Sequence, residues 1–439
     1  MNLQKLAPQQ TDDGANSRVL KRLYAVRPAW RSVQPAREAL DLPNFTLLHA
    51  GPPLADPRRP CLPLLSSATL CCLYEGWASD DAEAEQLITS GHVALRPAQE
   101  FDAVMPLAAV ISPRTSLVEV VDLNATLPGD RRAWSLLGSG AGPQLRFGSR
   151  DRRILERMAW RDGPLADCLS ALLAVAPVPL LPLAAIGLAG SDDLHASTAV
   201  ANAALRAQLL PLIEAKTWRG AEHERARIAA MLGESPLFFL TLWMAACHLM
   251  LNEAADGGRD AGSTLVVALA GNGECLGIRL AGQPRQWITA PALPPAGPRL
   301  NPLLQAEALP VIGDSGMIDV AGFGGQALAG APVIAAALSP WLPPDWRERP
   351  ARLLAGRHPA FASLGIGTGI DAAAVAMSGL APLIAIAMID AAGQQGSLGR
   401  GLLVPPSELF SRAVARTAVP QVVCTGAGAE QHAPGSARR

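Results

Sequence analysis

The sequence predicts an α+β protein with more than one domain. Its 439 residues exceed the common domain size of about 100–150 residues, and 49% of them are hydrophobic, which is enough to form a large core. The hydrophobic pattern also changes along the chain, from mixed to helical and then to short strands separated by glycine loops. We therefore expect a mixed α/β N-terminal domain over residues 1–150, a helical middle domain over 151–260, a glycine-loop-rich α/β C-terminal domain over 261–425 and a disordered tail over 426–439.

The N-terminal third alternates between helical and extended patterns. Asp80-Asp81 is a typical helix start and Gly91 a typical helix end. In chain order we expect a frayed segment over 1–18, a proline-interrupted helix over 22–40, a strand over 45–48, helices over 62–74 and 80–91, strands over 104–111 and 117–121, and a glycine-rich loop over 138–148.

The rest of the chain changes from helices to strands near residue 260. Two strands on either side of Ala270–Gly273 indicate a hairpin. In order we expect helices from 150 to about 253, a hinge over 256–260, strands over 264–269 and 276–280, a proline-rich connection over 291–302, and glycine loops at 313, 322–325, 365–369 and 393–401.

Composition excludes several classes of protein. The chain has 37 basic and 38 acidic residues, so its net charge gives no general attraction to nucleic acid or to anionic membranes. The apolar run 165–189 is broken by three prolines and the run 375–389 is too short to cross a membrane. Seven cysteines without a Cys-x-x-Cys spacing argue against a disulfide framework or a zinc ribbon. With no visible secretion signal, we expect a cytoplasmic protein.

Three short motifs invite functional interpretations that their surroundings do not favour. Gly313–Gly316 reads Gly-Asp-Ser-Gly, as around a trypsin-like nucleophile, but the chain is too helical for two β-barrels. Residues 112–116 resemble a carbamoyl-phosphate loop of transcarbamoylases, yet a strand rather than a helix follows them. The glycines of 322–325 and 365–369 allow close approach to an anion or simply form turns, and no Gly-Lys-Ser/Thr phosphate loop occurs.

Asp192, Asp193 and His195 form a compact polar cluster. Asp192 and His195 are three residues apart, a spacing that places both on one face of a helix. This arrangement suits acid–base catalysis, a weak divalent-ion site, or simple capping of the apolar helix that follows from Ala199. The spacing leaves catalysis and capping equally open.

A series of short motifs, in order, resembles the YlbE/AllG-like family, which includes the large subunit of oxamate carbamoyltransferase. The resemblance spans roughly His49 to Phe410. The matching segments are 47–53, 73–76, 110–113, 146–148, 262–266, 272–273, 277–279, 289–292, 313–315, 322–325 and 369–371.

The resemblance implies a role in a carbamoyltransferase complex. The carbamoyltransferase members of the family interconvert oxalurate plus phosphate with oxamate plus carbamoyl phosphate. They act beside an FdrA-like subunit that resembles succinyl-CoA synthetase and a third, smaller protein. We expect a subunit that acts on a small amide or amine with carbamoyl phosphate or a related acyl phosphate, in an oligomer, without a cofactor. The alternative is a non-catalytic or re-purposed partner of an FdrA-like protein.

The chain departs from the family pattern at several polar positions. A family run rich in histidine reads Ala98–Asp102 here, the Asn-Arg-Asn of another run is absent after His195, and Asp390 replaces a histidine. These losses favour the non-catalytic alternative, whereas the retained Asp192, His195 and Asn272 favour catalysis. We expect no tightly bound zinc or iron.

We expect the site where the C-terminal glycine loops meet the helical middle. The predicted catalytic residues are His195 as acid or base, Asp192 orienting it, and Asn272 as a donor to a carbonyl oxygen. Arg279 and Asn272 also fit ordinary surface and turn positions. The predicted substrate- or phosphate-binding residues are Arg279, Gly322, Gly324, Gly325, Gly367, Gly369, Asp314, Asp371 and His49.

Overall fold

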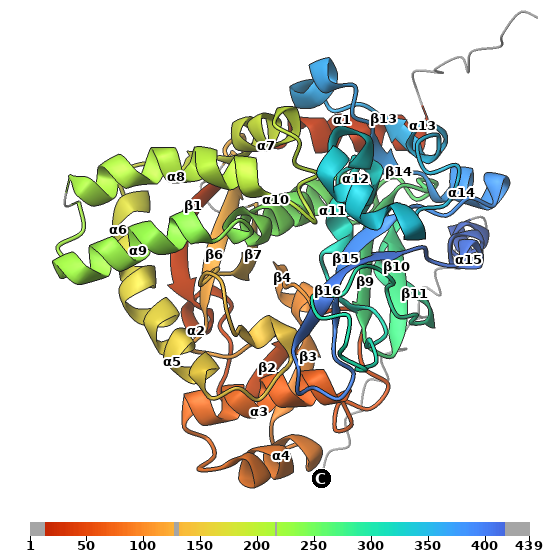
Figure 1. The fold of residues 1–439 in the computed structure, drawn as a ribbon. Helices are drawn as coiled ribbons and strands as arrows, with labels where there is room; N and C mark the ends of the chain where they lie inside the picture. The colour runs from red at the N-terminus through yellow and green to blue at the C-terminus, as the bar shows by residue number, and fades with distance from the viewer. Residues whose placement is uncertain (1–13, 127–130, 216, 418–439) are drawn as a thin grey trace, which may run out of the picture.

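The computed structural model describes residues 14–126, 131–215 and 217–417 and confirms the α+β class. Helices and several small sheets alternate along the chain (Figure 1). The predicted tail over 426–439 lies outside the described residues. The three-domain division remains a prediction.

The N-terminal part builds two sheets and three longer helices. Its elements are α1 (Ala15–Ala25), β1 (Pro28–Pro35), α2 (Ala36–Ala39), β2 (Thr46–His49), α3 (Leu62–Glu75), α4 (Asp81–Thr89), β3 (Ala94–Pro97), β4 (Ala103–Val104), β5 (Val110–Ile111), β6 (Ser116–Asp122) and β7 (Arg132–Leu136). One sheet has the order β4-β7-β6-β1-β8 and the other the order β3-β2-β5.

Several predicted N-terminal elements are confirmed. The strand at β2 and the helices α3 and α4 lie where the sequence placed them. Asp80 caps α4, because its Oδ1 accepts a hydrogen bond of 2.9 Å from the Glu83 amide. Residues 112–116 lead into strand β6 rather than into a helix, as their pattern indicated.

Three N-terminal predictions were wrong. The segment Pro28–Pro35 is strand β1 rather than part of a helix, and its prolines occupy the two ends of the strand, where proline is tolerated. The supposed strand over 104–111 is two short strands in different sheets, separated by Leu107 at φ 51°. Ala15–Arg18 belong to α1 rather than to a frayed end.

The middle of the chain is helical, as predicted, except for one short strand. Its elements are α5 (Arg153–Trp160), a π-helical turn (Arg161–Leu165), α6 (Ala166–Leu173), β8 (Val178–Pro179), α7 (Leu180–Ala189), α8 (Ala199–Glu214), α9 (Glu222–Glu234) and α10 (Phe238–Ala255). Strand β8 pairs with β1, and α6 packs on β1, so this helical part covers the N-terminal sheet.

The C-terminal part combines a four-stranded sheet of order β11-β10-β9-β12 with small two-stranded sheets. The predicted hairpin is confirmed by β9 and β10. The elements are β9 (Val266–Asn272), β10 (Cys275–Leu280), β11 (Gln283–Pro291), β12 (Ile312–Gly313), α11 (Gly316–Ala321), α12 (Pro332–Leu338), α13 (Arg349–Leu353), β13 (Leu354–Gly356), β14 (Thr368–Ile370), α14 (Ala372–Ser378), β15 (Ile384–Ile389), β16 (Ser397–Leu403) and α15 (Ser407–Thr417).

Helix α10 joins the two halves of the molecule. It runs through the centre (Figure 1) and contacts β6 and β7 on one side and β9 and α11 on the other. By length and composition the segment Phe238–Gly258 is apolar enough to cross a membrane, but its most apolar stretch is 89% buried within the protein. It is therefore accounted for as a core helix.

An aromatic cluster connects α10 to the C-terminal part. The ring of Trp243 lies 5.1 Å from that of Phe323 and 6.3 Å from that of Phe361, both in edge-to-face geometry. Phe239 stacks on Trp243 one turn earlier in the helix. All four side chains are buried, so the cluster fixes the position of α10 against the loops after α11.

We expect replacement of Trp243 by Ala to destabilise the protein by about 3–5 kcal/mol, because it leaves a cavity among packed rings. Leu303, which is 86% exposed, serves as the control, and its replacement by Ala should change stability by no more than about 0.5 kcal/mol. Urea unfolding of both variants measures the difference. Equal shifts of the two unfolding midpoints would contradict this account of the core.

Candidate functional site

A cavity of about 400 Å³ lies where the N-terminal, middle and C-terminal parts meet. Pro106 and Arg146 line it from the N-terminal part, His195 and Leu237 from the middle, and strands β15 and β16 from the C-terminal part. We call it the central cavity. His195 lines it together with Gly399 and Gly401 of the 393–401 glycine loop, whereas the glycine loops at 322–325 and 365–369 do not.

His195 is held by a buried carboxylate that the sequence did not indicate. Its Nδ1 lies 2.7 Å from Oδ2 of Asp319, on helix α11, and the Asp319 side chain is completely buried. Asp319 Oδ1 accepts hydrogen bonds from the amides of Gly325 (2.7 Å) and Ala385 (2.9 Å). With Nδ1 engaged, Nε2 is the ring nitrogen left without a hydrogen bond to the described residues, on a side chain that lines the cavity.

The loop before α8 presents His195 through a strained backbone. Ser191 and Leu194 have φ values of 77° and 66°, which are unusual for residues other than glycine. Asp193 Oδ1 accepts hydrogen bonds from the amides of His195 and Ser197, and its carbonyl oxygen accepts one from Gly324. Strain that the surroundings hold in place is common at functional sites.

Asp192 has a different role from the predicted one. Its Oδ2 accepts hydrogen bonds of 2.9 Å from the amides of Val200 and Ala201, in the first turn of α8. Its Oδ1 accepts one from the Ser197 hydroxyl. Asp192 therefore caps α8, as the capping alternative indicated, and Asp319 rather than Asp192 orients His195.

The surroundings of His195 change its protonation. Burial by itself lowers its pKa, but the charge of Asp319 and the hydrogen bond to it raise the pKa by more, with a smaller contribution from Asp193. The net effect is a pKa above the ordinary value of 6.5. Burial also raises the pKa of Asp193. His195 is thus suited to hold a proton near neutral pH and to donate it.

Arg146 brings positive charge to the central cavity. It follows the glycine-rich loop, stacks on the ring of Phe147 at 4.8 Å, and forms no ion pair with a described carboxylate. Burial lowers the pKa of Arg146 to about 10, which still leaves it charged at neutral pH. Arg299 and Arg400 also line the cavity and likewise lack a carboxylate partner among the described residues.

Asp314 and Arg279 lie together but belong to a separate buried network. Asp314 accepts hydrogen bonds from the amides of Gly51 and Met105 and from Gln99, whose carbonyl oxygen accepts one from Arg279. Burial raises the pKa of Asp314 to about 6. This network ties the N-terminal part to the β9 sheet. Ser315, the next residue, does line the central cavity.

Two other predicted residues have their polar groups engaged in the fold, and a third is buried without lining the central cavity. Asn272 donates to the carbonyl oxygens of Pro52 and Pro53 and accepts from two amides of its own turn, so the turn interpretation is the one that the structure favours. Asp371 caps α14 through the Ala373 amide. His49 is fully buried, and its Nδ1 contacts the carbonyl of Ala50 while its Nε2 has no hydrogen-bond partner among the described residues. Burial lowers the pKa of His49 to about 4.

The predicted anion-binding glycines serve close packing instead. The amides of three of these glycines already have acceptors. Gly322 donates to the carbonyl oxygen of Asp319, Gly324 to that of Asp193, and Gly325 to the carboxylate of Asp319. A Cβ on Gly322 would lie 2.2 Å from the carbonyl oxygen of Gly367. Gly369 packs with φ 75° against Leu20 and Leu265.

Sequence patterns contained weak signals for the residues that were missed. Asp319 is the one charged residue in the apolar stretch Met317–Ala321, and an acidic residue in such a stretch often has a specific partner. Arg146 was noted only as part of a family motif. Within the described ranges, no three His, Cys, Asp or Glu side chains are grouped so as to hold a metal ion.

Comparison with known proteins identifies related chains. A family model described as oxamate carbamoyltransferase subunit AllG matches residues 93–315. The Escherichia coli K12 oxamate carbamoyltransferase subunit AllG is 30% identical, covering 91% of this chain and 96% of that protein. The uncharacterized protein YahG of the same strain is 28% identical over 91% of this chain and 84% of its own.

A solved structure shares the fold. It is a conserved protein of unknown function from Enterococcus faecalis V583, which is 26% identical and superposes with a TM-score of 0.83. The match covers 92% of this chain and 96% of that chain.

Replacement of Asp319 by Asn should lower the pKa of His195 from above 6.5 to below it, because burial then acts without the opposing carboxylate charge. Histidine NMR titration of the isolated chain measures this shift. A native pKa above the unfolded value stabilises the fold fully below about pH 6.5, and this contribution is lost as the pH rises through the native pKa. The stability difference between the wild type and the variant should therefore be larger at pH 6 than at pH 9. An unchanged His195 titration would contradict the pairing.

Proposed function

The chain belongs to the family of the oxamate carbamoyltransferase subunit AllG, and we propose on this basis that it is the catalytic subunit of a carbamoyltransferase-like complex. The proposed reaction moves a carbamoyl or related acyl group between phosphate and the nitrogen of a small amide or amine. The observation that supports it is the His195–Asp319 pair at the central cavity.

The chemistry needs a proton at the nitrogen that gains or loses the acyl group. When phosphate oxygen attacks the carbonyl carbon, a C–O bond forms and the C–N bond breaks, so the departing nitrogen must take up a proton. A protonated His195 supplies it from Nε2 and becomes neutral. In the reverse direction neutral His195 accepts the proton from the attacking nitrogen. The raised pKa of His195 favours the donor role near neutral pH.

Positive charge and an apolar lining fit the same chemistry. Arg146, Arg299 and Arg400 provide cationic groups for anionic substrates, and none forms an ion pair with a carboxylate of the described ranges. Apolar side chains such as Leu107, Leu240 and Ile386 line the cavity between them. Low polarity around a fixed charge strengthens its effect on a developing negative charge.

We also propose the partners that the family resemblance implied, which are an FdrA-like subunit and a third small subunit. We propose the cytoplasm as the compartment. The alternative of a non-catalytic or re-purposed subunit rests on one observation. Gln99 lies in the segment in which the resembled family carries histidines. Its side-chain amide donates a hydrogen bond to Asp314 and accepts one from Arg279.

His195→Ala should lower turnover by the reconstituted complex by about 100-fold or more, the usual contribution of a general acid or base. His223→Ala is the matched control, because His223 is 79% exposed and lies on α9, away from the central cavity. Steady-state rates with carbamoyl phosphate and the amide substrate, measured beside circular dichroism, separate catalysis from folding. Full activity of folded His195→Ala in the complex would favour the non-catalytic alternative.

A further inference from the structure

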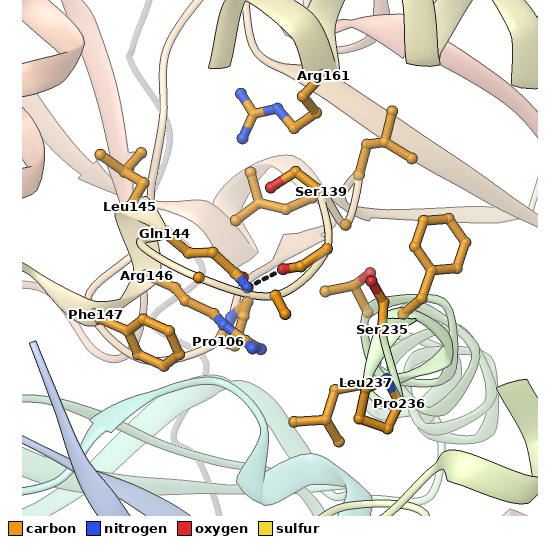
Figure 2. Close-up of a pocket in the computed structure, with 18 residues that line it drawn as sticks. Pro106, Ser139, Gln144, Leu145, Arg146, Phe147, Arg161, Ser235, Pro236 and Leu237 are labelled. Atoms are coloured by element: carbon orange, nitrogen blue, oxygen red, sulfur yellow. Dashed lines mark hydrogen bonds between the residues drawn. The ribbon is translucent and has the colours of Figure 1, made fainter. Parts of the chain in front are cut away.

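We propose that a second cavity, next to the central one, binds the phosphoryl group of the acyl phosphate. It has a volume of about 220 Å³ and lies between the glycine loop Gly138–Gly142 and the start of α10 (Figure 2). We call it the loop cavity. The inference rests on the proposed function, and it assigns a place to the phosphate that the C-terminal glycine loops do not offer.

Unpaired polar side chains point to a ligand in the loop cavity. Ser235 and Thr241 are 5% and 6% exposed, and neither hydroxyl oxygen has a hydrogen-bond partner. The Nε of Arg146 is buried and unpartnered as well. All three residues line this one cavity. Buried polar groups without hydrogen-bond partners cost stability. Three such groups around one cavity indicate that a polar ligand supplies the missing hydrogen bonds.

Backbone amides of residues that line the same cavity also lack partners. The amide N–H groups of Gly138–Gly142 donate no hydrogen bond to any acceptor in the part of the chain that the structure describes. Helix α10 is 18 residues long, begins at Phe238 on the wall of the cavity, and has no side-chain cap. Free amides and the positive end of a helix dipole together favour an anion.

The net charge of the loop cavity comes from Arg146. Arg161 also lines it, but its guanidinium forms two hydrogen bonds of 2.7 Å with the carboxylate of Asp162, which neutralises it. The Asp162 carboxylate also accepts a hydrogen bond from the amide of Ser116. Arg146 therefore remains the cation available to an anionic ligand. In Figure 2 its side chain extends between the loop and Leu237, at the start of α10.

The loop is fixed in the shape that forms the cavity. Gly140 and Gly142 have φ values of 94° and 100°, which other residues rarely adopt. The Ser139 carbonyl accepts a hydrogen bond of 2.7 Å from Arg157, and the Gly140 carbonyl accepts one from Gln144 (Figure 2). These contacts engage the carbonyl oxygens of Ser139 and Gly140, whereas the amides of the loop have no such partner among the described residues.

The two cavities adjoin in a way that suits one substrate. Pro106, Arg146, Phe147 and Leu237 line both of them. A phosphoryl group in the loop cavity would place the attached carbonyl toward the central cavity and His195. Arg146, which lines both cavities, would contact the oxygen that joins phosphorus to the carbonyl carbon. Charge on this oxygen grows as the acyl group leaves phosphate, so Arg146 would stabilise it.

Titration calorimetry of the full chain with inorganic phosphate tests this inference. We expect saturable binding that Arg146→Gln weakens by about tenfold or more and Thr241→Val by about 2–10-fold, from the loss of one charged and one neutral hydrogen bond. Arg96→Gln and Thr69→Val are matched controls. Arg96 also stacks on an aromatic ring, Thr69 also has a buried unpaired hydroxyl, and neither lines either cavity. Both controls should bind phosphate as the wild type does.

The outcomes separate this inference from the proposed function. Absence of phosphate binding, or binding that neither Arg146→Gln nor Thr241→Val weakens, would overturn the phosphate site. A second result would also overturn it. If oxamate binds, both variants weaken that binding and phosphate does not bind, the loop cavity holds a carboxylate rather than a phosphoryl group. Thr241→Val removes an unpaired hydroxyl and should fold at least as well as the wild type, which keeps the result interpretable. Phosphate binding at this site beside full activity of His195→Ala would instead overturn only the proposed catalytic role.

Discussion

The buried carboxylate of Asp319 is the constraint on which the site depends. A charge taken out of water is costly unless partners surround it, and two of the three partners of Asp319 come from distant segments of the chain. They are His195 before α8, the amide of Gly325 and the amide of Ala385 in β15. Satisfying this one carboxylate brings the middle and C-terminal parts together. It also accounts for the positive φ of Leu194, since the loop must turn sharply to bring His195 into reach.

The glycines show why a ligand loop and a packing turn are hard to tell apart in a sequence. Both need a residue without Cβ, and the sequence records only that need. At Gly322 and Gly324 the close neighbours are a backbone carbonyl and the Asp319 carboxylate, so these glycines allow protein groups to approach each other. At Gly138–Gly142 the amides have no acceptor among the described residues and adjoin unpaired hydroxyls. The difference lies in tertiary contacts, which periodicity and composition do not contain.

Local sequence signals predicted much of the fold. Elements that depend on contacts between distant segments could not be predicted in this way. Helix α4 was recognised from its Asp80 cap, and the β9–β10 hairpin from its Asn-Gly turn, because both depend on neighbours in sequence. Strand β1 was mistaken for helix because its identity comes from pairing with β6, about 85 residues later, rather than from its own propensity. His195 was found by residue type, whereas Asp319 lies 124 residues away, and no spacing rule connects them. Asp192 is the carboxylate nearer to His195 in sequence, but it accepts hydrogen bonds from amides of α8 instead.

Asp319 sets the proton affinity of His195, the imidazole that we propose serves the reacting nitrogen. The pH dependence of kcat/KM for the reconstituted complex, in the direction in which nitrogen leaves the carbonyl carbon, tests it most directly. For the wild type, we expect a rate that falls as the pH rises through a pKa above 6.5. With Asp319→Asn, the fall should move to lower pH, because the imidazole then loses its proton sooner. An identical pH profile in both proteins would show that the His195–Asp319 pair does not carry the proton.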